Sequence, residues 1–165
     1  MADILKVSNL NTEFKSDYGS KQALKNITFN IKDGEVLALV GESGSGKTVT
    51  SLSIMGLLPN NASVQEGEIK LIDKNNNEIN ILNLSDEQHN EIRGNDISMV
   101  FQEPMTCLNP TMTVGEQILE VIIRHKKISK INAKKEMIGL LELVEIPDPI
   151  QRSNEYPHQL SGGMR

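Results

Sequence analysis

The amino-acid sequence predicts an α/β fold: a mixed sheet with antiparallel strands near the N-terminus and parallel strands after them, joined to a helical subdomain. Three observations support this prediction. Residues 23–31 alternate between apolar and polar side chains, as in a strand with one solvated face. Residues 36–40 are continuously apolar, as in a strand buried on both faces, and a glycine-rich loop and a helical pattern follow them. After about residue 106 the apolar period becomes helical.

Length and composition favour one domain that is stable without a disulfide or a structural metal ion. A chain of 165 residues buries roughly 70% of its surface on folding. We therefore expect one domain over 1–165, with a core at about 1–105 and a helical subdomain at about 106–165. The single cysteine, Cys107, excludes an internal disulfide and favours a reducing compartment.

Charge and hydropathy argue against a membrane-spanning, a secreted or a nucleic-acid-binding protein. No apolar run approaches the roughly 20 residues that span a bilayer, and residues 1–6 lack the features of a secretory signal. The formal net charge of −5 disfavours nucleic-acid binding, because phosphate contacts need clustered Lys and Arg. Only residues 124–135 are locally basic, which fits either a solvated helix face or a contact with anionic lipid.

The N-terminal half reads as strands interrupted by one helix. Residues 4–10 and 23–31 are expected strands, and residues 36–40 are expected to form a central parallel strand. A mostly apolar helix should start at Lys47 and stop before Pro59. Residues 68–73 and 78–82 flank an Asn-rich turn, which predicts a hairpin.

Capping boxes predict where the later helices start. Ser85 and Gln88 have the required spacing and predict a helix over about 86–93, ahead of a short strand at 96–101. Thr113 and Glu116 predict a second helix start, and Ser129 or Asn132 can cap a third helix. The expected buried face of that third helix has helical spacing: Met137, Leu140, Leu141 and Val144.

The strongest chemical signal lies between the apolar run at 36–40 and the first helix. It matches G-x-x-x-x-G-K-[ST] at every fixed position and reads Gly41-Glu42-Ser43-Gly44-Ser45-Gly46-Lys47-Thr48. Glycines let a backbone approach phosphate closely, and a helix N-terminus favours negative charge. Lys47 would reach the β- and γ-phosphates of ATP, and the Thr48 hydroxyl would ligate Mg²⁺. A plain glycine turn with an exposed lysine is the alternative, and the strand–loop–helix context disfavours it.

The pattern at residues 41–48 is that of a P-loop, and two later segments indicate which class of P-loop protein the chain resembles. Gln102 ends the expected strand at 96–101, and Leu160-Ser161-Gly162-Gly163-Met164 lies near residue 165. Either segment alone is a solvated strand end or a plain turn. In this order, the P-loop, the glutamine and the Leu-Ser-Gly-Gly-Met run resemble the nucleotide-binding subunits of ABC transporters. The surroundings of Gln102, and Tyr156-Pro157-His158-Gln159 before the second segment, resemble the peptide and nickel importer ATPases, although Cys107 stands where that family more often has Ser.

The resemblance implies roles for individual residues. Phe14 takes the place of an aromatic residue that stacks on adenine, with Tyr18 as the rival and a small core contact as the other reading of Phe14. Gln102 senses Mg²⁺ and the γ-phosphate and positions water. Ser161, Gly162 and Gly163 contact the nucleotide of an opposite subunit. The implied nucleotide contacts are Phe14, Gly41, Glu42, Ser43, Gly44, Ser45, Gly46, Lys47, Thr48, Val49, Gln102, Ser161, Gly162 and Gly163, with Thr48 and Gln102 on the metal.

Hydrolysis in this family also uses an Asp-Glu pair and a histidine that come after the Leu-Ser-Gly-Gly-Met run. Within the 165 residues, Asp73 precedes a lysine in the hairpin, and Asp86-Glu87 reads as a helix start. His89, His125 and His158 read as surface residues. We therefore expect these residues to bind MgATP and not to hydrolyse it alone.

The expected function is that of an energy-coupling subunit of an importer for oligopeptides, dipeptides or nickel. The implied partners are two transmembrane permease subunits, a second ATPase subunit, identical or paralogous, and indirectly an extracytoplasmic solute-binding protein. The implied location is the cytoplasmic face of a bacterial or archaeal cell membrane, without a nucleic-acid partner. A soluble ABC-type ATPase acting on nucleic acid or ribosomes, and a truncated product without activity, are the alternatives.

Overall fold

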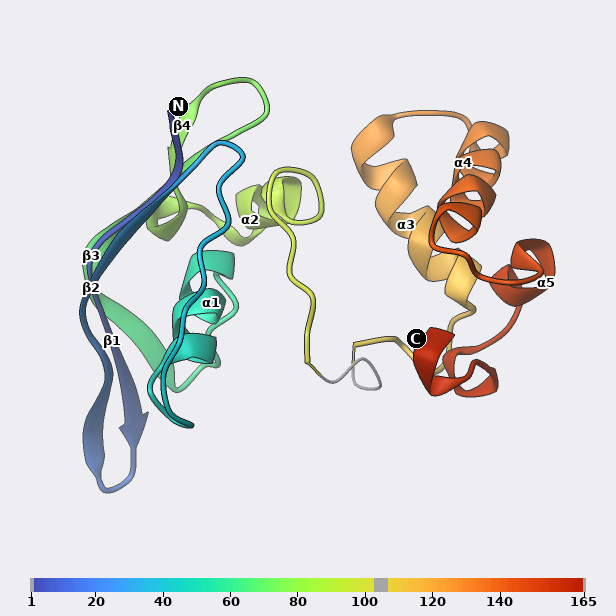
Figure 1. Cartoon of the computed structure of the whole chain (residues 1–165). Helices are drawn as coiled ribbons and strands as arrows, with labels where there is room; N and C mark the ends of the chain where they lie inside the picture. Colours follow the sequence, from blue (N-terminus) through green and yellow to red (C-terminus); the bar gives the residue numbers. More distant parts are fainter. Residues whose placement is uncertain (1, 103–106, 165) are drawn as a thin grey trace. The chain divides into compact units, whose positions relative to one another are not determined.

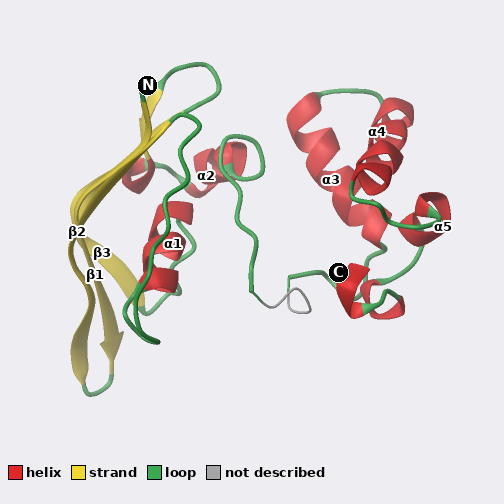
Figure 2. Cartoon of the chain, in the orientation of Figure 1, coloured by secondary structure: helices red, strands yellow, loops and turns green. Residues whose placement is uncertain are grey.

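The computed structural model describes residues 2–102 and 107–164. It divides the chain into two compact units, Met1–Ser98 and Met99–Arg165 (Figure 1). Strands belong to the first unit, and the second unit, where it is described, is helical (Figure 2). No helix in the described residues is both long and apolar enough to cross a membrane.

The first unit is built on a four-stranded antiparallel sheet of order β2-β1-β3-β4. Its strands are β1 (Asp3–Ser16), β2 (Gly19–Lys32), β3 (Ala62–Ile72) and β4 (Glu78–Asn80). The predicted strands at 4–10 and 23–31 and the hairpin at 68–82 are confirmed, and β1, β2 and β3 extend further than predicted.

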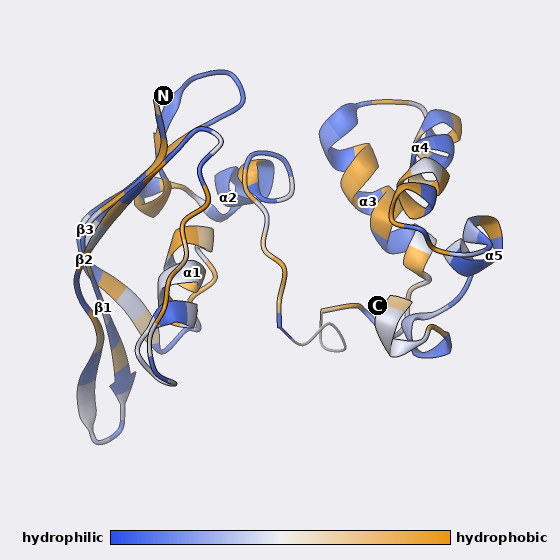
Figure 3. Cartoon of the chain, in the orientation of Figure 1, coloured by the Kyte–Doolittle hydropathy of each residue, from blue (hydrophilic) through white to orange (hydrophobic). Residues whose placement is uncertain are grey.

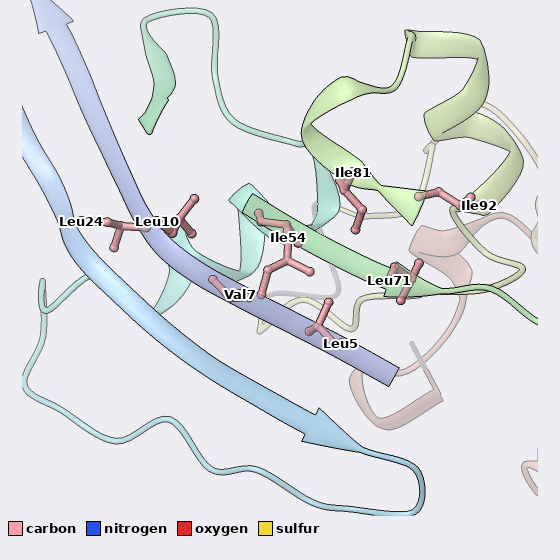
Figure 4. Packing of buried hydrophobic residues seen from close by; sticks show 9 residues of the cluster. Leu5, Val7, Leu10, Leu24, Ile54, Leu71, Ile81 and Ile92 are labelled. Atoms are coloured by element: carbon pink, nitrogen blue, oxygen red, sulfur yellow. The ribbon is translucent and has the colours of Figure 1, made fainter. Parts of the chain in front are cut away.

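Side chains on one face of the sheet form the main core. Leu5, Val7, Leu10 and Thr12 of β1 are all buried, although Val7 and Leu10 are three residues apart. A register shift between them, with Asn9 at φ 49, returns Leu10 to the buried face. The core side chains shown in Figure 4 meet Ile54 of the first helix; the buried cluster is Leu5, Val7, Leu10, Leu24, Ile54, Ile69, Leu71, Ile81 and Ile92.

Helix α1 (Lys47–Met55) packs on this face and is shorter than predicted. It ends at Gly56, which adopts φ 61 and caps the helix, three residues before Pro59. Arg93, at the end of helix α2 (Asp86–Ile92), donates from Nε to Met55 O (2.9 Å) and from Nη2 to Gly56 O (2.5 Å). A cation thus satisfies the C-terminal carbonyls of α1, where the helix dipole is negative.

Short elements connect the hairpin to α2. A 3₁₀ turn, η1 (Ile81–Asn83), buries Ile81, and the capping box predicted at Ser85 and Gln88 starts α2. The turn between β3 and β4 is closed by Asp73, whose carboxylate accepts hydrogen bonds from Asn75 N and Asn77 N, each at 2.8 Å.

The second unit is a helical hairpin with short additions. Helices α3 (Val114–Lys126) and α4 (Lys130–Leu143) precede α5 (Pro149–Ser153) and two 3₁₀ turns, η3 (Pro157–Gln159) and η4 (Gly162–Met164). The capping box at Thr113 and Glu116 is confirmed, and Ser129 caps α4 rather than Asn132.

The seam between α3 and α4 is narrower than the sequence predicted. Ile122, Ala133 and Met137 form its buried core, and Leu141 is buried as well. Leu140 and Val144, expected on the same face, are 40% and 64% exposed. A seam between only two helices buries a stripe narrower than the full apolar face of α4.

Two predicted strands are not strands in the structure. Residues 35–42 run as a loop between β2 and α1, with Val36 and Val40 at least 90% exposed (Figure 2). Residues 98–101 are also irregular, and a single bridge joins Arg93 to Ile97. A strand needs at least one neighbour with which to pair, and in the described part of the chain neither segment has a ladder partner. The parallel strands expected beside the antiparallel ones are therefore absent from the described sheet.

Candidate functional site

The glycine-rich segment forms a tight loop that leads directly into α1. Ser45 N donates to Glu42 O at 3.2 Å and closes a turn inside the loop. Gly44 and Gly46 have φ values of 79 and 94, a region that glycine enters without steric cost. The two glycines therefore permit the curvature of the loop.

Gly46 also fixes where the loop sits on the sheet. It is the N-cap residue of α1, and a Cβ at this position would lie 2.6 Å from Leu24 Cδ2 and 3.2 Å from Ala23 O. Leu24 belongs to β2 and is buried. The loop backbone thus packs directly on a core side chain, and only glycine fits there.

The Lys47 side chain folds back over the loop. Its Nζ donates to Gly41 O at 2.7 Å, to Glu42 O at 2.8 Å and, at 3.4 Å, to Ser45 Oγ. These bonds place a positive charge beside the loop amides and close to the start of α1. A bound anion would meet this ammonium group and the amides together.

The first turn of α1 presents donors that nothing in the described chain caps. Gly46 supplies no side-chain cap, and the first turn carries no acidic residue. The first amides of a helix have no partner inside the helix, and the helix dipole is positive at this end. The arrangement of residues 41–48 is therefore suited to a phosphate group.

The Thr48 hydroxyl is available as a metal ligand. Among the hydroxyl residues of α1, Thr50, Ser51 and Ser53 donate to backbone carbonyls four residues earlier. Thr48 is exposed, and its hydroxyl has no hydrogen bond within residues 2–102 and 107–164. Mg²⁺ takes oxygen ligands and shares them with substrate phosphates and water, so one free hydroxyl fits a nucleotide-bound Mg²⁺. In the described residues no three His, Cys, Asp or Glu side chains gather into a separate metal site.

A buried hydroxyl pair fixes the middle of α1 to the sheet. Thr12 Oγ1 and Ser53 Oγ lie 3.3 Å apart, and both residues are buried. Ser53 donates its only hydroxyl hydrogen to Val49 O at 2.8 Å, so Thr12 is the donor of the pair. With Gly46 on Leu24 at one end and Arg93 at the other, α1 is held at three points.

The structure distinguishes the two aromatic candidates. Phe14 is half-buried on β1, where it pairs with Lys21 and Ala62. Tyr18 lies in the turn between β1 and β2 and is fully exposed. Both residues belong to the unit that carries the glycine loop, and they differ in the exposure of their side chains.

The remaining candidates belong to the second unit. Gln102 is exposed, and residues 103–106, expected to continue its segment, lie outside the described residues. Ser161, Gly162 and Gly163 are exposed, while Leu160 before them is buried. The structure thus groups residues 41–49 with Phe14 in one unit, and Gln102 with residues 161–163 in the other.

Two glutamines to which the sequence analysis gave no structural role shape these segments. The amide of Gln117 accepts from Asn109 N at 2.9 Å and donates to Asn109 O at 3.0 Å and to Met112 O at 3.2 Å, so α3 holds the loop after residue 107. Gln159 Oε1 accepts from Tyr156 N at 2.8 Å and closes the turn that delivers Leu160 into the core.

The acidic groups considered as alternatives have structural roles. Hydrogen bonds from Asn77 and Asn75 lower the pKa of Asp73, and Asp86 and Glu87 occupy the first turn of α2. Hydrogen bonds from the backbone and hydroxyl of Thr113 lower the pKa of Glu116.

Two of the three histidines expected at the surface, His89 and His125, are half-buried. His89 Nε2 is buried, has no partner in the described residues, and packs on Gly56, where a Cβ would lie 2.4 Å from it.

A comparison with protein families matches residues 24–165 to the ABC transporter model. The dipeptide transport ATP-binding protein DppD of Bacillus subtilis (strain 168) is 51% identical over 166 residues, which cover 100% of this chain and 48% of that protein. The oligopeptide transport ATP-binding protein OppD of the same strain is 48% identical, covering 98% and 44% of the two chains. The chain thus spans about half the length of these curated relatives.

Solved structures of an ATP-binding cassette are similar as well. The dimeric structure of MJ0796, described as a bacterial ABC transporter cassette, superposes with a TM-score of 0.78 at 30% identity, covering 97% of this chain and 64% of that one. A second dimeric structure of MJ0796, in a post-hydrolysis state bound to ADP and Pi, superposes with a TM-score of 0.76 at 29% identity, with the same coverage. The predicted P-loop α/β fold class is thereby confirmed.

Proposed function

The chain belongs to the ABC transporter family, and from that premise we propose that it is the nucleotide-binding part of the ATP-binding subunit of a peptide importer. The observation that carries the proposal is the loop at residues 41–48. It combines the Lys47 ammonium, the uncapped amides of α1 and the free Thr48 hydroxyl on a helix fixed to the sheet at three points.

We propose ATP with Mg²⁺ as the ligand. The amides of Gly41 to Val49 surround the phosphates, Lys47 neutralises the β- and γ-phosphates, and the Thr48 hydroxyl ligates the metal ion. Phe14 stacks on the adenine; its half-buried position on β1 supports this assignment over Tyr18. When bound, Mg²⁺ offsets charge on the phosphate oxygens.

We assign Gln102 to the sensing of Mg²⁺ and the γ-phosphate, and Ser161, Gly162 and Gly163 to a nucleotide held by a second ATPase subunit. The two glycines support this second role. Both are exposed, neither has a positive φ, and a Cβ on either would meet nothing within 4 Å. The described fold does not itself require glycine there, and the lack of a side chain leaves room for another molecule to approach the backbone closely.

We also propose that the 165-residue chain binds MgATP without turning it over. Hydrolysis requires a carboxylate that orients water and another that holds the metal shell. In the described part of the chain, Asp73 is held in its turn by Asn75 and Asn77, and Asp86 and Glu87 lie in the first turn of α2. We therefore assign ATP turnover to a subunit of the length of the curated relatives, about half of which this chain spans.

The transported solute in this proposal is a peptide rather than nickel, since the two relatives described above are named for dipeptide and oligopeptide transport. The proposed partners are two permease subunits, a second ATPase subunit and, indirectly, an extracytoplasmic solute-binding protein. The proposed location is the cytoplasmic face of the cell membrane.

The test is a titration of the chain with a fluorescent ATP analogue in Mg²⁺, together with a phosphate-release assay. We expect saturable binding that unlabelled ATP displaces, and no turnover above that of a Lys47→Ala control. Binding that does not saturate would refute the ATP assignment. Turnover that depends on Lys47 would refute the assignment of hydrolysis to the longer subunit.

A further inference from the structure

The end of the helical hairpin carries a concentration of positive charge that the nucleotide site does not use. Residues 124–135 contain six Lys and Arg and no Asp or Glu, although the chain as a whole has a net charge of −5. They span the end of α3 and the start of α4, which the hydropathy colouring shows as strongly hydrophilic (Figure 3).

One of these cations joins the two helices. Lys126 of α3 pairs with Glu136 of α4 and ties the two helices together. In contrast, Lys127, Lys130, Lys134 and Lys135 are exposed and have no ion pair in the described part of the chain. We call these four lysines, with Ile131 among them, the cationic flank.

The cationic flank is electrostatically unfavourable for the helix that bears it. Lys130 is the first residue of α4, and the first turn of that helix has no acidic residue. The positive end of a helix dipole normally attracts Asp or Glu, and a cation there is disfavoured. An anion outside the protein would offset this cost, and it would meet the flank and the helix end together.

The flank is also partly apolar. Ile131 is 71% exposed, and at 100° per residue it lies between Lys134 and Lys135 on the surface of α4. Beside it, Lys130 and Lys134 line a cavity of about 420 Å³ whose apolar wall includes Leu119, Met137, Ile138 and Ile150. Cations above aliphatic side chains match the boundary between lipid headgroups and acyl chains.

We propose that the cationic flank docks on an anionic phospholipid surface, with headgroup phosphates on Lys130, Lys134 and Lys135 and with Ile131 entering the interface. Lipid is favoured over nucleic acid because the exposed apolar group is aliphatic and the flank has no aromatic side chain on which bases stack. A long polyanion would extend over the rest of the chain, whose net charge of −5 would repel it. A membrane surface would contact only the end of the hairpin, where the positive charges lie. The proposal goes beyond nucleotide binding and does not depend on it.

The test is co-sedimentation of the chain with vesicles, without permease or nucleotide. One set is pure phosphatidylcholine, and the other contains about one third phosphatidylglycerol. We expect binding to the anionic set only, lost on raising the salt from about 0.1 M to about 0.5 M. Each neutralised lysine should weaken binding about fivefold, so the Lys130→Gln, Lys134→Gln, Lys135→Gln triple variant should bind about a hundredfold more weakly.

A matched triple variant controls for net charge. Lys21→Gln, Lys25→Gln and Lys32→Gln remove the same charge from exposed positions of β2 and should change binding less than threefold, a bound set by the local range of surface charge. Ile131→Ala favours helix and should still weaken binding, with the fold of each variant checked by circular dichroism. Equal binding to neutral vesicles, equal effects of the two triple variants, or tighter binding to a short DNA or RNA duplex than to anionic vesicles would each overturn the proposal.

Discussion

Replacing Lys47 by Met tests the electrostatic role of the loop while keeping most of the apolar stem of the side chain. The ammonium group is fixed by Gly41 O and Glu42 O at 2.7 and 2.8 Å, so it adjoins the amides that we assign to phosphate. A hydrogen bond between an ammonium and an anionic oxygen contributes about 1.5–3 kcal/mol. Lys47 is half-buried, so solvent screening favours the lower part of that range. A loss of about 2 kcal/mol weakens ATP binding roughly thirtyfold.

The assay is a titration with a fluorescent ATP analogue, and thermal unfolding of the same samples separates binding from folding. Lys25→Met is the matched control: Lys25 is exposed on β2, and its replacement by Met removes the same charge as Lys47→Met does. We expect the control to bind as the native chain does. A Lys47→Met chain that remains folded and binds ATP within about threefold of the native affinity, less than 1 kcal/mol, would refute the reasoning.

Three further predictions concern the stability of the fold and the recognition of the adenine base. Gly46→Ala should lower the free energy of unfolding, measured by urea titration, by about 2–4 kcal/mol, because a Cβ there would clash with Leu24 and because φ is 94. The control Gly162→Ala, at an exposed position, should change the free energy of unfolding by less than about 0.5 kcal/mol. Phe14→Ala should weaken ATP binding about five- to hundredfold and leave inorganic triphosphate binding unchanged, and equal losses for both ligands would contradict base stacking. The folded-state pKa of Glu116 is lowered, so its capping box stabilises α3 at neutral pH and is lost as the pH falls through that lowered pKa. Glu116→Gln should therefore lose less stability than the native chain on acidification below about pH 5, measured by urea unfolding at several pH values, and identical pH profiles would contradict the account.

Local chemistry made much of the fold predictable. The capping boxes at Ser85 and Thr113 depend on residues three positions apart, and both form where the sequence placed them. The hairpin around Asp73 likewise depends on a short turn between two strand patterns. Such features are complete within a few residues, so one sequence is enough to show them.

Features that depend on distant residues were less predictable. The apolar run at 36–40 has strand composition, yet composition does not supply a neighbouring strand, and the segment runs exposed in the structure. The register shift at Asn9 and the packing of Gly46 on Leu24 also arise from the fold as a whole. The motif predicted a loop that leads into a helix at Lys47, which the structure has, but not the contacts of Lys47 with two loop carbonyls.

The central claim is that the main-chain amides of residues 41–48 surround the phosphates of a nucleotide. Its most direct test is the change in amide chemical shifts of the isotopically labelled chain on titration with MgATP. We expect the largest changes at residues 41–48, with smaller ones near Phe14 and none in the exposed turn around Asp73. At millimolar MgATP, even a binding free energy of only about −4 kcal/mol would produce detectable changes. If the signals of residues 41–48 do not move at that concentration, the claim is wrong.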